Sequence, residues 1–246
     1  MSEWIDCARA ALPAARTYGE AVRAAVERAV APDGTPDPAR LTREQHRVHG
    51  FAWIAATLAA LEATLDWAVR AEGAGRLGPV EELTLRIGFG EGLAQIAAGL
   101  PMSAHEVVRP AAFGTEAEAR ALAADPAAAR LIAEGSTPES RADLAALLAE
   151  GARPCEALGD EALDLIRDQI RAFTAEEIAP HAHAWHLADA LIPDAVIARM
   201  AGLGVFGICI PEAYGGLGLG KLAMAVVSEE LSRGWICAGS LGTRSE

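Results

Sequence analysis

Apolar residues recur at three- and four-residue steps along most of the chain, and that spacing places them on one face of a helix. Residues 5–30 predict a first amphipathic helix, kinked near Pro13. A break rich in proline and glycine over residues 32–38 separates it from a second helix, which we expect to begin at Thr42, with Gln45 completing a capping box. The apolar face of the second helix comprises Phe51, Ile54, Leu58, Leu61, Leu65 and Ala68.

Two further helices complete the N-terminal part. The third follows Pro79 and ends at Gly99. Its apolar side chains are Val80, Leu83, Ile87, Leu93 and Ile96. Ser103 and Glu106 have the spacing of another capping box, which predicts a short helix that ends before Pro110. We therefore expect a helical extension over residues 1–112.

The middle of the chain has a different composition. Residues 113–158 are dominated by alanine, glutamate and arginine, with short helical pieces that begin at Thr115 and Thr137. Few of these side chains are large enough to fill a core. We therefore expect a helical linker or lid between the extension over residues 1–112 and a last domain over residues 159–246.

Helical periodicity returns at Asp160. Pro193 lies in the first turn of the next helix, where a missing N–H group costs nothing. After a glycine-rich segment, two more helices are expected over residues 222–233 and 235–246. No long alternating pattern occurs, so the predicted class is all-α, with one short extended piece at residues 206–210. The helix that begins at Asp160 has an apolar face made of Leu163, Ile166, Ile170 and Phe173.

Composition narrows the class of protein further. The chain has 246 residues, 52% of them hydrophobic, and its alanine content favours helix. A net charge of -13 argues against nucleic acid or an anionic membrane as partner. We find no signal peptide and no apolar run near the ~20 residues needed to span a bilayer. Because its four cysteines are scattered, we expect reduced thiols in a soluble, cytoplasmic protein.

The glycine-rich segment allows three interpretations. Gly215, Gly220 and Lys221 match half of a phosphate-binding loop, but Leu222 offers no hydroxyl for magnesium. The alternating glycines over residues 216–220 lack the spacing of a dinucleotide fingerprint, and no βαβ unit surrounds them. The third interpretation is a tight turn between helices, in which glycine adopts positive φ and neither a phosphate nor a dinucleotide is bound.

The histidines do not predict a metal site. His181, His183 and His186 have no cysteine or carboxylate at a useful spacing, so we expect a solvated loop rather than a zinc centre. The isolated histidines are expected in packing or surface roles, and they are His46, His49 and His105.

Three motifs of the C-terminal part occur in the order and spacing of a known family. They are Gly204-Val-Phe-Gly207, Pro211-Glu-Ala-Tyr-Gly-Gly-Leu-Gly218 and Ser228-Glu-Glu-Leu-Ser-Arg233. Together they resemble the N-terminal α-domain of the flavin-dependent acyl-CoA dehydrogenases, and the resemblance covers residues 160–246.

The resemblance implies an enzyme that desaturates an acyl-CoA thioester. In that family the α-domain packs beside a β-barrel and a C-terminal helical domain. Together they hold FAD and the acyl-CoA, pass electrons to an electron-transferring flavoprotein and form a homo-oligomer. The catalytic glutamate and the main flavin contacts belong to the later domains. The resemblance therefore implies no catalytic, flavin-binding or metal-binding residue here, and this chain alone is expected to be inactive.

The resemblance also implies residues for the wall of the acyl pocket. These are Trp235, Ser240, Thr243 and Arg244. Ordinary packing and capping are the alternative role for each of them.

Three further stretches resemble one subfamily, which has a helical extension and acts on methylsuccinyl-CoA in the ethylmalonyl-CoA pathway. They are His49-Gly-Phe-Ala-Trp53, Ile87-Gly-Phe-Gly-Glu91 and residues 239–246. Such an acyl group carries a free carboxylate, which the guanidinium of Arg244 is suited to neutralise. Other substrates stay open, for example glutaryl-, isobutyryl- or longer acyl-CoA. A non-catalytic helical scaffold derived from the family stays open as well.

Overall fold

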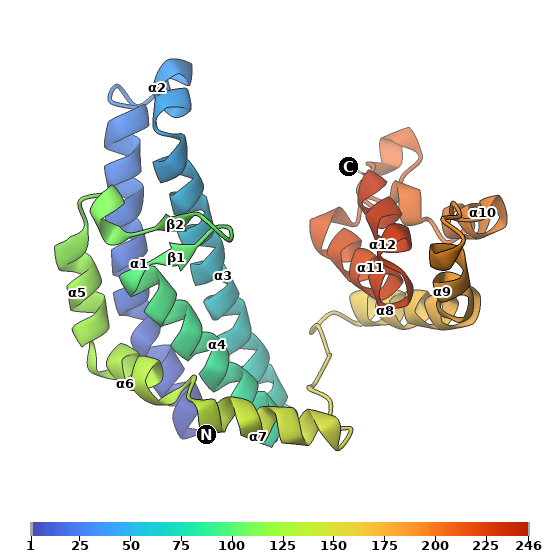
Figure 1. Ribbon diagram of the computed structural model, residues 1–246, viewed down its shortest axis with the longest axis horizontal. Coiled ribbons are helices and arrows are strands. Elements are labelled where there is room, and N and C mark those ends of the chain that lie inside the picture. Colours follow the sequence, from blue (N-terminus) through green and yellow to red (C-terminus); the bar gives the residue numbers. More distant parts are fainter. Residues whose placement is uncertain (1, 246) are drawn as a thin grey trace. The chain divides into compact units, whose positions relative to one another are not determined.

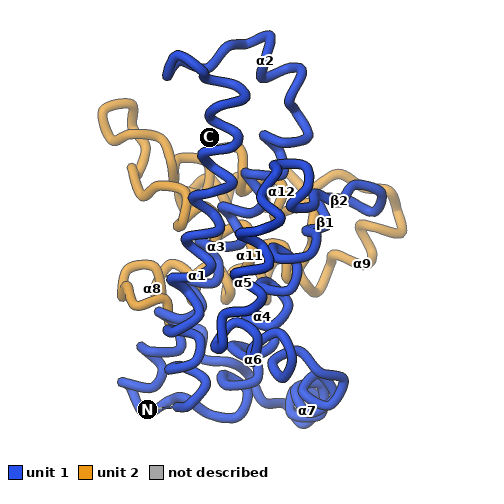
Figure 2. Tube along the Cα trace, turned by 90° about the vertical axis from the view of Figure 1, so that its left-hand side faces the viewer, with its two compact units in different colours: residues 1–156 blue, residues 157–246 orange. Residues whose placement is uncertain are grey.

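The structure is a computed structural model that describes residues 2–245, and the chain divides into two compact units at residues 156 and 157. Figure 1 shows the elements of each unit, and Figure 2 colours the two units separately. Helices form nearly all of the regular structure. The described residues contain only two strands, each of two residues, so the all-α prediction is confirmed.

Unit 1 is built on three long helices. α1 (Glu3–Val30), α3 (Gln45–Gly73) and α4 (Pro79–Ala98) pack against one another as a bundle (Figure 1). The shorter elements are α2 (Pro38–Arg43), β1 (Leu100–Pro101), β2 (Val107–Val108), η1 (Pro110–Ala112), α5 (Glu116–Ala124), α6 (Pro126–Glu134) and α7 (Pro138–Ala149).

Small residues let these helices approach closely. A Cβ atom added at Gly90 of α4 would lie 2.7 Å from the carbonyl oxygen of Leu131 on α6. A Cβ atom at Gly135 would overlap the carbonyl oxygen of Arg86 on α4. These two glycines therefore allow the backbones of α4 and of the end of α6 to lie in direct contact.

The structure differs from the linker expected over residues 113–158. Leu122 of α5 and Leu131 of α6 are fully buried in the same core as α1 and α4. Alanines such as Ala119 and Ala128 complete this packing, because small side chains suffice where helices lie close. α5 and α6 are thus part of unit 1 and not a linker.

Two capping boxes expected in this unit are absent. Asp37 caps α2 by accepting from the N–H groups of Ala39 and Arg40, whereas Thr42 lies inside α2 and caps nothing. Around Ser103 and Glu106 the chain forms the turn of a hairpin instead of a helix. Its strands pair antiparallel with Leu100 opposite Val108.

A buried carboxylate fixes the end of unit 1. Glu81 accepts hydrogen bonds from the N–H of Gly78, at 2.9 Å, and from the N–H of Cys155, at 2.7 Å. The indole N–H of Trp67 donates to the carbonyl oxygen of Cys155, also at 2.7 Å. The chain is therefore held on unit 1 as far as residue 155.

Unit 2 contains shorter helices. They are α8 (Glu161–Phe173), the π-helical turn η2 (Thr174–Ile178), α9 (Ala179–Leu187), α10 (Asp194–Gly202), η3 (Val205–Gly207), η4 (Glu212–Tyr214), α11 (Gly220–Gly234), α12 (Ile236–Gly242) and η5 (Thr243–Ser245). The predicted apolar face of α8 packs into the core of this unit. The short extended piece expected at residues 206–210 is wrong, because η3 and a bend occupy that position.

One helix of the described residues, α3, is long and apolar enough to cross a membrane by length and composition. The sequence shows no uninterrupted apolar run of this length, because Thr57, Glu62 and Thr64 lie among the apolar residues. Only 22% of this apolar window is buried. The buried side of α3 packs against α1 and α4.

Candidate functional site

The glycine-rich segment of unit 2 is a loop that folds back on itself. Gly204, Gly215, Gly218 and Gly220 have φ between 63° and 83°, a region that favours glycine. A side chain at Gly216 would overlap the carbonyl oxygen of Ile210. These positions need glycine for the turn itself, as the third interpretation of the sequence expected.

The loop uses its own amide groups. Five successive backbone N–H groups donate to carbonyl oxygens of residues 207–212, and they belong to Gly215, Gly216, Leu217, Gly218 and Leu219. A phosphate-binding loop needs such groups free and pointing at the ligand. The internal hydrogen bonds therefore argue against both nucleotide interpretations.

Apolar side chains of the same loop point to solvent. Tyr214 is 83% exposed and Leu222 59%, while Leu217 and Leu219 are about half exposed. Four large apolar residues within nine positions form a patch of the kind that marks a contact surface.

Trp235 occupies the junction between α11 and α12. Its ring lies 5.6 Å from that of Trp185 on α9, and Trp185 in turn lies 5.4 Å from His181. In this unit Trp235 thus packs α9 against the start of α12.

The other three predicted pocket residues lie together at the far end of α12. Ser240, Thr243 and Arg244 are all exposed. The Thr243 hydroxyl donates to the carbonyl oxygen of Ser240 at 2.9 Å. No ion pair between Arg244 and another residue of the range 2–245 is present. η5 packs beside η3, which places these residues next to the glycine-rich loop.

α12 itself is set by close packing on α11. A Cβ atom at Gly239 would overlap the hydroxyl of Ser232 and lie 2.9 Å from the carbonyl oxygen of Ser228. A Cβ atom at Gly242 would lie 2.9 Å from the Ser228 hydroxyl. The two glycines therefore determine where Ser240 and Arg244 stand.

Sequence reasoning missed one buried ion pair. Glu230 was expected on a helix face with Glu229, but only 3% of its side chain is exposed. Its carboxylate accepts from Nε and Nη2 of Arg171 on α8, at 2.9 and 2.6 Å. The bidentate geometry joins α8 to α11 and explains why this carboxylate is not a free base.

Unit 2 also has a recess of about 530 Å³ between α8 and α10. Its lining includes Phe173, Glu176 and Arg199, and the Arg199 guanidinium lies 5.4 Å from the Phe173 ring centre while pairing with Glu177. None of the predicted pocket residues lines it, and no sequence motif pointed to it.

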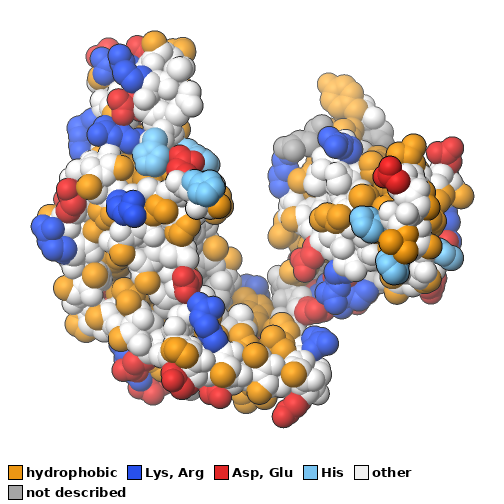
Figure 3. All heavy atoms as spheres, viewed as in Figure 1, with side chains coloured by type: hydrophobic (Ala, Val, Ile, Leu, Met, Phe, Trp, Pro, Cys, Tyr) orange, Lys and Arg blue, Asp and Glu red, His pale blue; other side chains and the backbone are white. Residues whose placement is uncertain are grey.

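The histidines show no metal centre. Among the described residues no three His, Cys, Asp or Glu side chains form a possible metal site. His181, His183 and His186 belong to α9, so the expected loop is wrong. Figure 3 shows histidine beside acidic side chains on unit 1, where His46 lies 3.0 Å and His49 3.9 Å from Glu106. All four cysteines are free thiols.

Comparison with known proteins identifies the family. Residues 160–245 match the model described as acyl-CoA dehydrogenase, N-terminal domain. Residues 160–245 therefore carry the N-terminal α-domain of the acyl-CoA dehydrogenase family, and the chain as a whole is similar to one protein of that family.

The relatives differ in how much of the chain they share. The chain is 45% identical to (2S)-methylsuccinyl-CoA dehydrogenase of Cereibacter sphaeroides over 249 residues. This alignment covers 100% of the chain and 45% of that protein. Glutaryl-CoA dehydrogenase of Desulfococcus multivorans is 36% identical over 74 residues, 29% of this chain and 19% of that protein. Mitochondrial isovaleryl-CoA dehydrogenase of Solanum tuberosum is 35% identical over 86 residues, 35% of this chain and 20% of that protein. The chain thus spans less than half the length of each of these relatives.

Proposed function

We propose that this chain forms part of an FAD-dependent acyl-CoA dehydrogenase acting on a short branched or dicarboxylic acyl-CoA, with methylsuccinyl-CoA as the first candidate. The observation that carries the proposal is the extent of the similarity. Unit 1 as well as unit 2 aligns with the Cereibacter protein, whereas the glutaryl- and isovaleryl-CoA dehydrogenases align over about a third of the chain.

We assign flavin binding mainly to other parts of the whole enzyme. The amide groups of the glycine-rich loop donate within the loop, so they are not offered to a phosphate.

What these residues supply is shape and exclusion of water. Removing the α-proton of a thioester needs a dry site in which the developing charge is stabilised. The exposed apolar side chains of Tyr214, Leu217, Leu219 and Leu222 suit a surface that other domains of the enzyme cover. The end of α12 would then form part of the acyl pocket wall.

Arg244 is proposed to receive the distal carboxylate of the acyl group. It is exposed, it has no ion partner among residues 2–245, and the hydroxyl-bearing Ser240 and Thr243 lie within one helical turn of it. A guanidinium is suited to bidentate binding of a carboxylate.

The test uses the full-length enzyme. Arg244→Ala should lower kcat/KM for methylsuccinyl-CoA by about 10- to 100-fold, because a charge-assisted hydrogen bond is lost. The same change should leave kcat/KM for butyryl-CoA, which lacks a distal carboxylate, within about twofold. Arg76→Ala, an exposed arginine of unit 1, is the control. Equal losses with both substrates would refute the assignment.

The remaining properties follow from the same proposal. They are electron transfer to an electron-transferring flavoprotein, assembly as a homo-oligomer and a cytoplasmic location in the ethylmalonyl-CoA pathway. A substrate panel with glutaryl-, isobutyryl- and longer acyl-CoA decides between substrates. No observation favours the alternative of a non-catalytic scaffold.

A further inference from the structure

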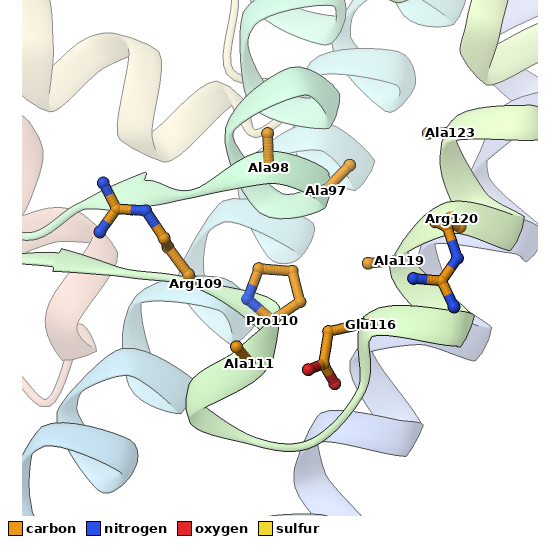
Figure 4. A pocket seen from close by; sticks show the side chains of 9 residues that line it. All are labelled: Ala97, Ala98, Arg109, Pro110, Ala111, Glu116, Ala119, Arg120 and Ala123. Carbon is orange, nitrogen blue, oxygen red and sulfur yellow. The ribbon is translucent and has the colours of Figure 1, made fainter.

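Unit 1 has a recess that the proposed dehydrogenase function does not use. It measures about 310 Å³ and lies where the end of α4, the η1 turn and α5 meet. Figure 4 shows its lining: five alanines and the Pro110 ring surround the space, with charged side chains at its edges. Small side chains from three segments leave this volume open, and it is at the lower end of the range for small-molecule sites.

Two arginines stand on opposite sides of the recess. Arg109 follows β2 and Arg120 belongs to α5, and Figure 4 shows their guanidinium groups well separated. Neither guanidinium has an ion pair or a hydrogen bond among the described residues. Arg23 and Arg130 of the same unit, in contrast, are each paired with two carboxylates. In a chain of net charge -13, these two guanidiniums give the recess a local positive charge.

Glu116 lies on the same edge and must be included. It precedes Arg120 by one helical turn, in the order that favours an ion pair on a helix. No salt bridge nevertheless forms between them, so the carboxylate oxygens of Glu116 lie more than 4.0 Å from the guanidinium nitrogens of Arg120. The Glu116 carboxylate therefore competes with a bound anion for the Arg120 guanidinium, but it does not occupy that guanidinium.

We propose that this recess binds a short aliphatic carboxylate. The carboxylate would pair with Arg120 or Arg109, and the aliphatic part would lie over the alanine methyl groups and Pro110. A dicarboxylate would bind more tightly than a monocarboxylate, because its second negative charge is attracted to the second arginine. Both arginines are exposed, so each ion pair contributes little and dissociation constants on the order of millimolar are expected.

The test is an NMR titration of this chain at constant ionic strength, following the arginine Nε–H and backbone amide signals. The probes are glutarate, butyrate, inorganic phosphate and chloride. We expect saturable shifts at Arg109, Arg120 and Ala97, with affinity in the order glutarate, butyrate, phosphate. Phosphate ranks below glutarate because it has no apolar part to bury.

Matched variants separate the site from general anion effects. Arg120→Gln and Arg109→Gln should each weaken glutarate binding by about 3- to 10-fold, and Arg43→Gln, an exposed arginine of α2, should not. Glu116→Gln should tighten binding, because the competing carboxylate is gone. Ala98→Leu should abolish binding by filling the recess.

Either of two results would overturn the proposal. One is a glutarate titration in which the NMR shifts of arginines all over the surface have the same midpoint. That result would show an unspecific salt effect only. The other is glutarate binding that survives both Arg120→Gln and Ala98→Leu. A thermal melt of each variant checks that the fold is intact. The outcome does not depend on the dehydrogenase assignment, since the site lies in unit 1 and the readout needs no turnover.

Discussion

Single residues that look alike in the sequence have opposite roles in unit 2. Glu229 and Glu230 are neighbours on α11, yet Glu229 is exposed and Glu230 is buried against Arg171. Removing one partner of a buried pair leaves the other charge without compensation. Glu230→Ala should therefore lower the free energy of unfolding of unit 2 by about 2–3 kcal/mol, at the low end because Arg171 is partly exposed.

Urea unfolding measures this effect, and Glu229→Ala is the matched control, expected within about 0.5 kcal/mol of the parent. Equal effects of the two substitutions would show that the Arg171–Glu230 pair does not stabilise the unit. Sequence patterns could not separate the two residues, because both are acidic and only the position of α8 decides which one is covered.

Tyr18 makes a second prediction at this scale. It is 1% exposed, and burial raises the pKa of its phenol. The Thr115 side chain lies near its hydroxyl, but no hydrogen bond of good geometry reaches that hydroxyl among the described residues. A raised pKa gives stability that is complete below the unfolded value of about 10 and is lost as pH rises through the folded value. Tyr18→Phe should raise stability at neutral pH by about 1 kcal/mol, because an unpaired buried hydroxyl is removed.

Urea midpoints at neutral and alkaline pH test it. The parent should lose stability above pH ~10 more steeply than Tyr18→Phe does. A variant that is less stable than the parent at neutral pH would mean that the hydroxyl makes a favourable contact.

At the scale of elements, the crossing of α11 and α12 depends on a glycine. Alanine is the better helix former, but a Cβ atom at Gly239 would overlap Ser232. Gly239→Ala should destabilise unit 2 by about 1–3 kcal/mol. Gly202→Ala on α10, where no atom lies within 4 Å of the added Cβ, should be neutral or stabilising. Thermal unfolding of both variants measures the contrast, and destabilisation by Gly202→Ala of the same size would contradict it.

Periodicity predicted the long elements well. α1 and α8 lie close to their expected positions, because each has an apolar face that is visible in the sequence. α4 does so because Pro79 and Gly99 mark its two ends. It failed for α9, whose alternating His and Ala residues show no apolar face, and for the hairpin, whose strands are too short for a pattern. The spacing of Ser103 and Glu106 suits a turn as well as a capping box, so it could not distinguish the two.

Alanine-rich packing explains why the linker expected over residues 113–158 was not found for α5 and α6. α5 and α6 bury Leu122 and Leu131 among alanines, and nothing in their sequence distinguishes such helices from an exposed linker. In the candidate site, the positions of Ser240, Thr243 and Arg244 come from family motifs. The closeness of η5 to η3 comes from tertiary packing that the sequence does not show.

At the scale of the whole molecule, the connection between the units is short. Cys155 is held on unit 1 by Glu81 and Trp67, and the N–H of Leu158 donates to Asp164 of unit 2 at 3.1 Å. Limited proteolysis with subtilisin should therefore cut first between residues 155 and 158. Glu81→Ala should extend cutting upstream of residue 155, because the buried anchor is lost. First cuts within residues 113–134 would instead support the linker expected from the sequence.

The central claim is that this chain is part of a flavin-dependent acyl-CoA dehydrogenase, and one measurement tests it most directly. The full-length protein is purified and mixed without oxygen with (2S)-methylsuccinyl-CoA while its visible absorbance is recorded. We predict a yellow protein whose oxidised-flavin band bleaches on mixing, and bleaches less with a neutral short acyl-CoA. A colourless protein that takes up no added FAD, or a flavin band unchanged by every acyl-CoA, would contradict the claim.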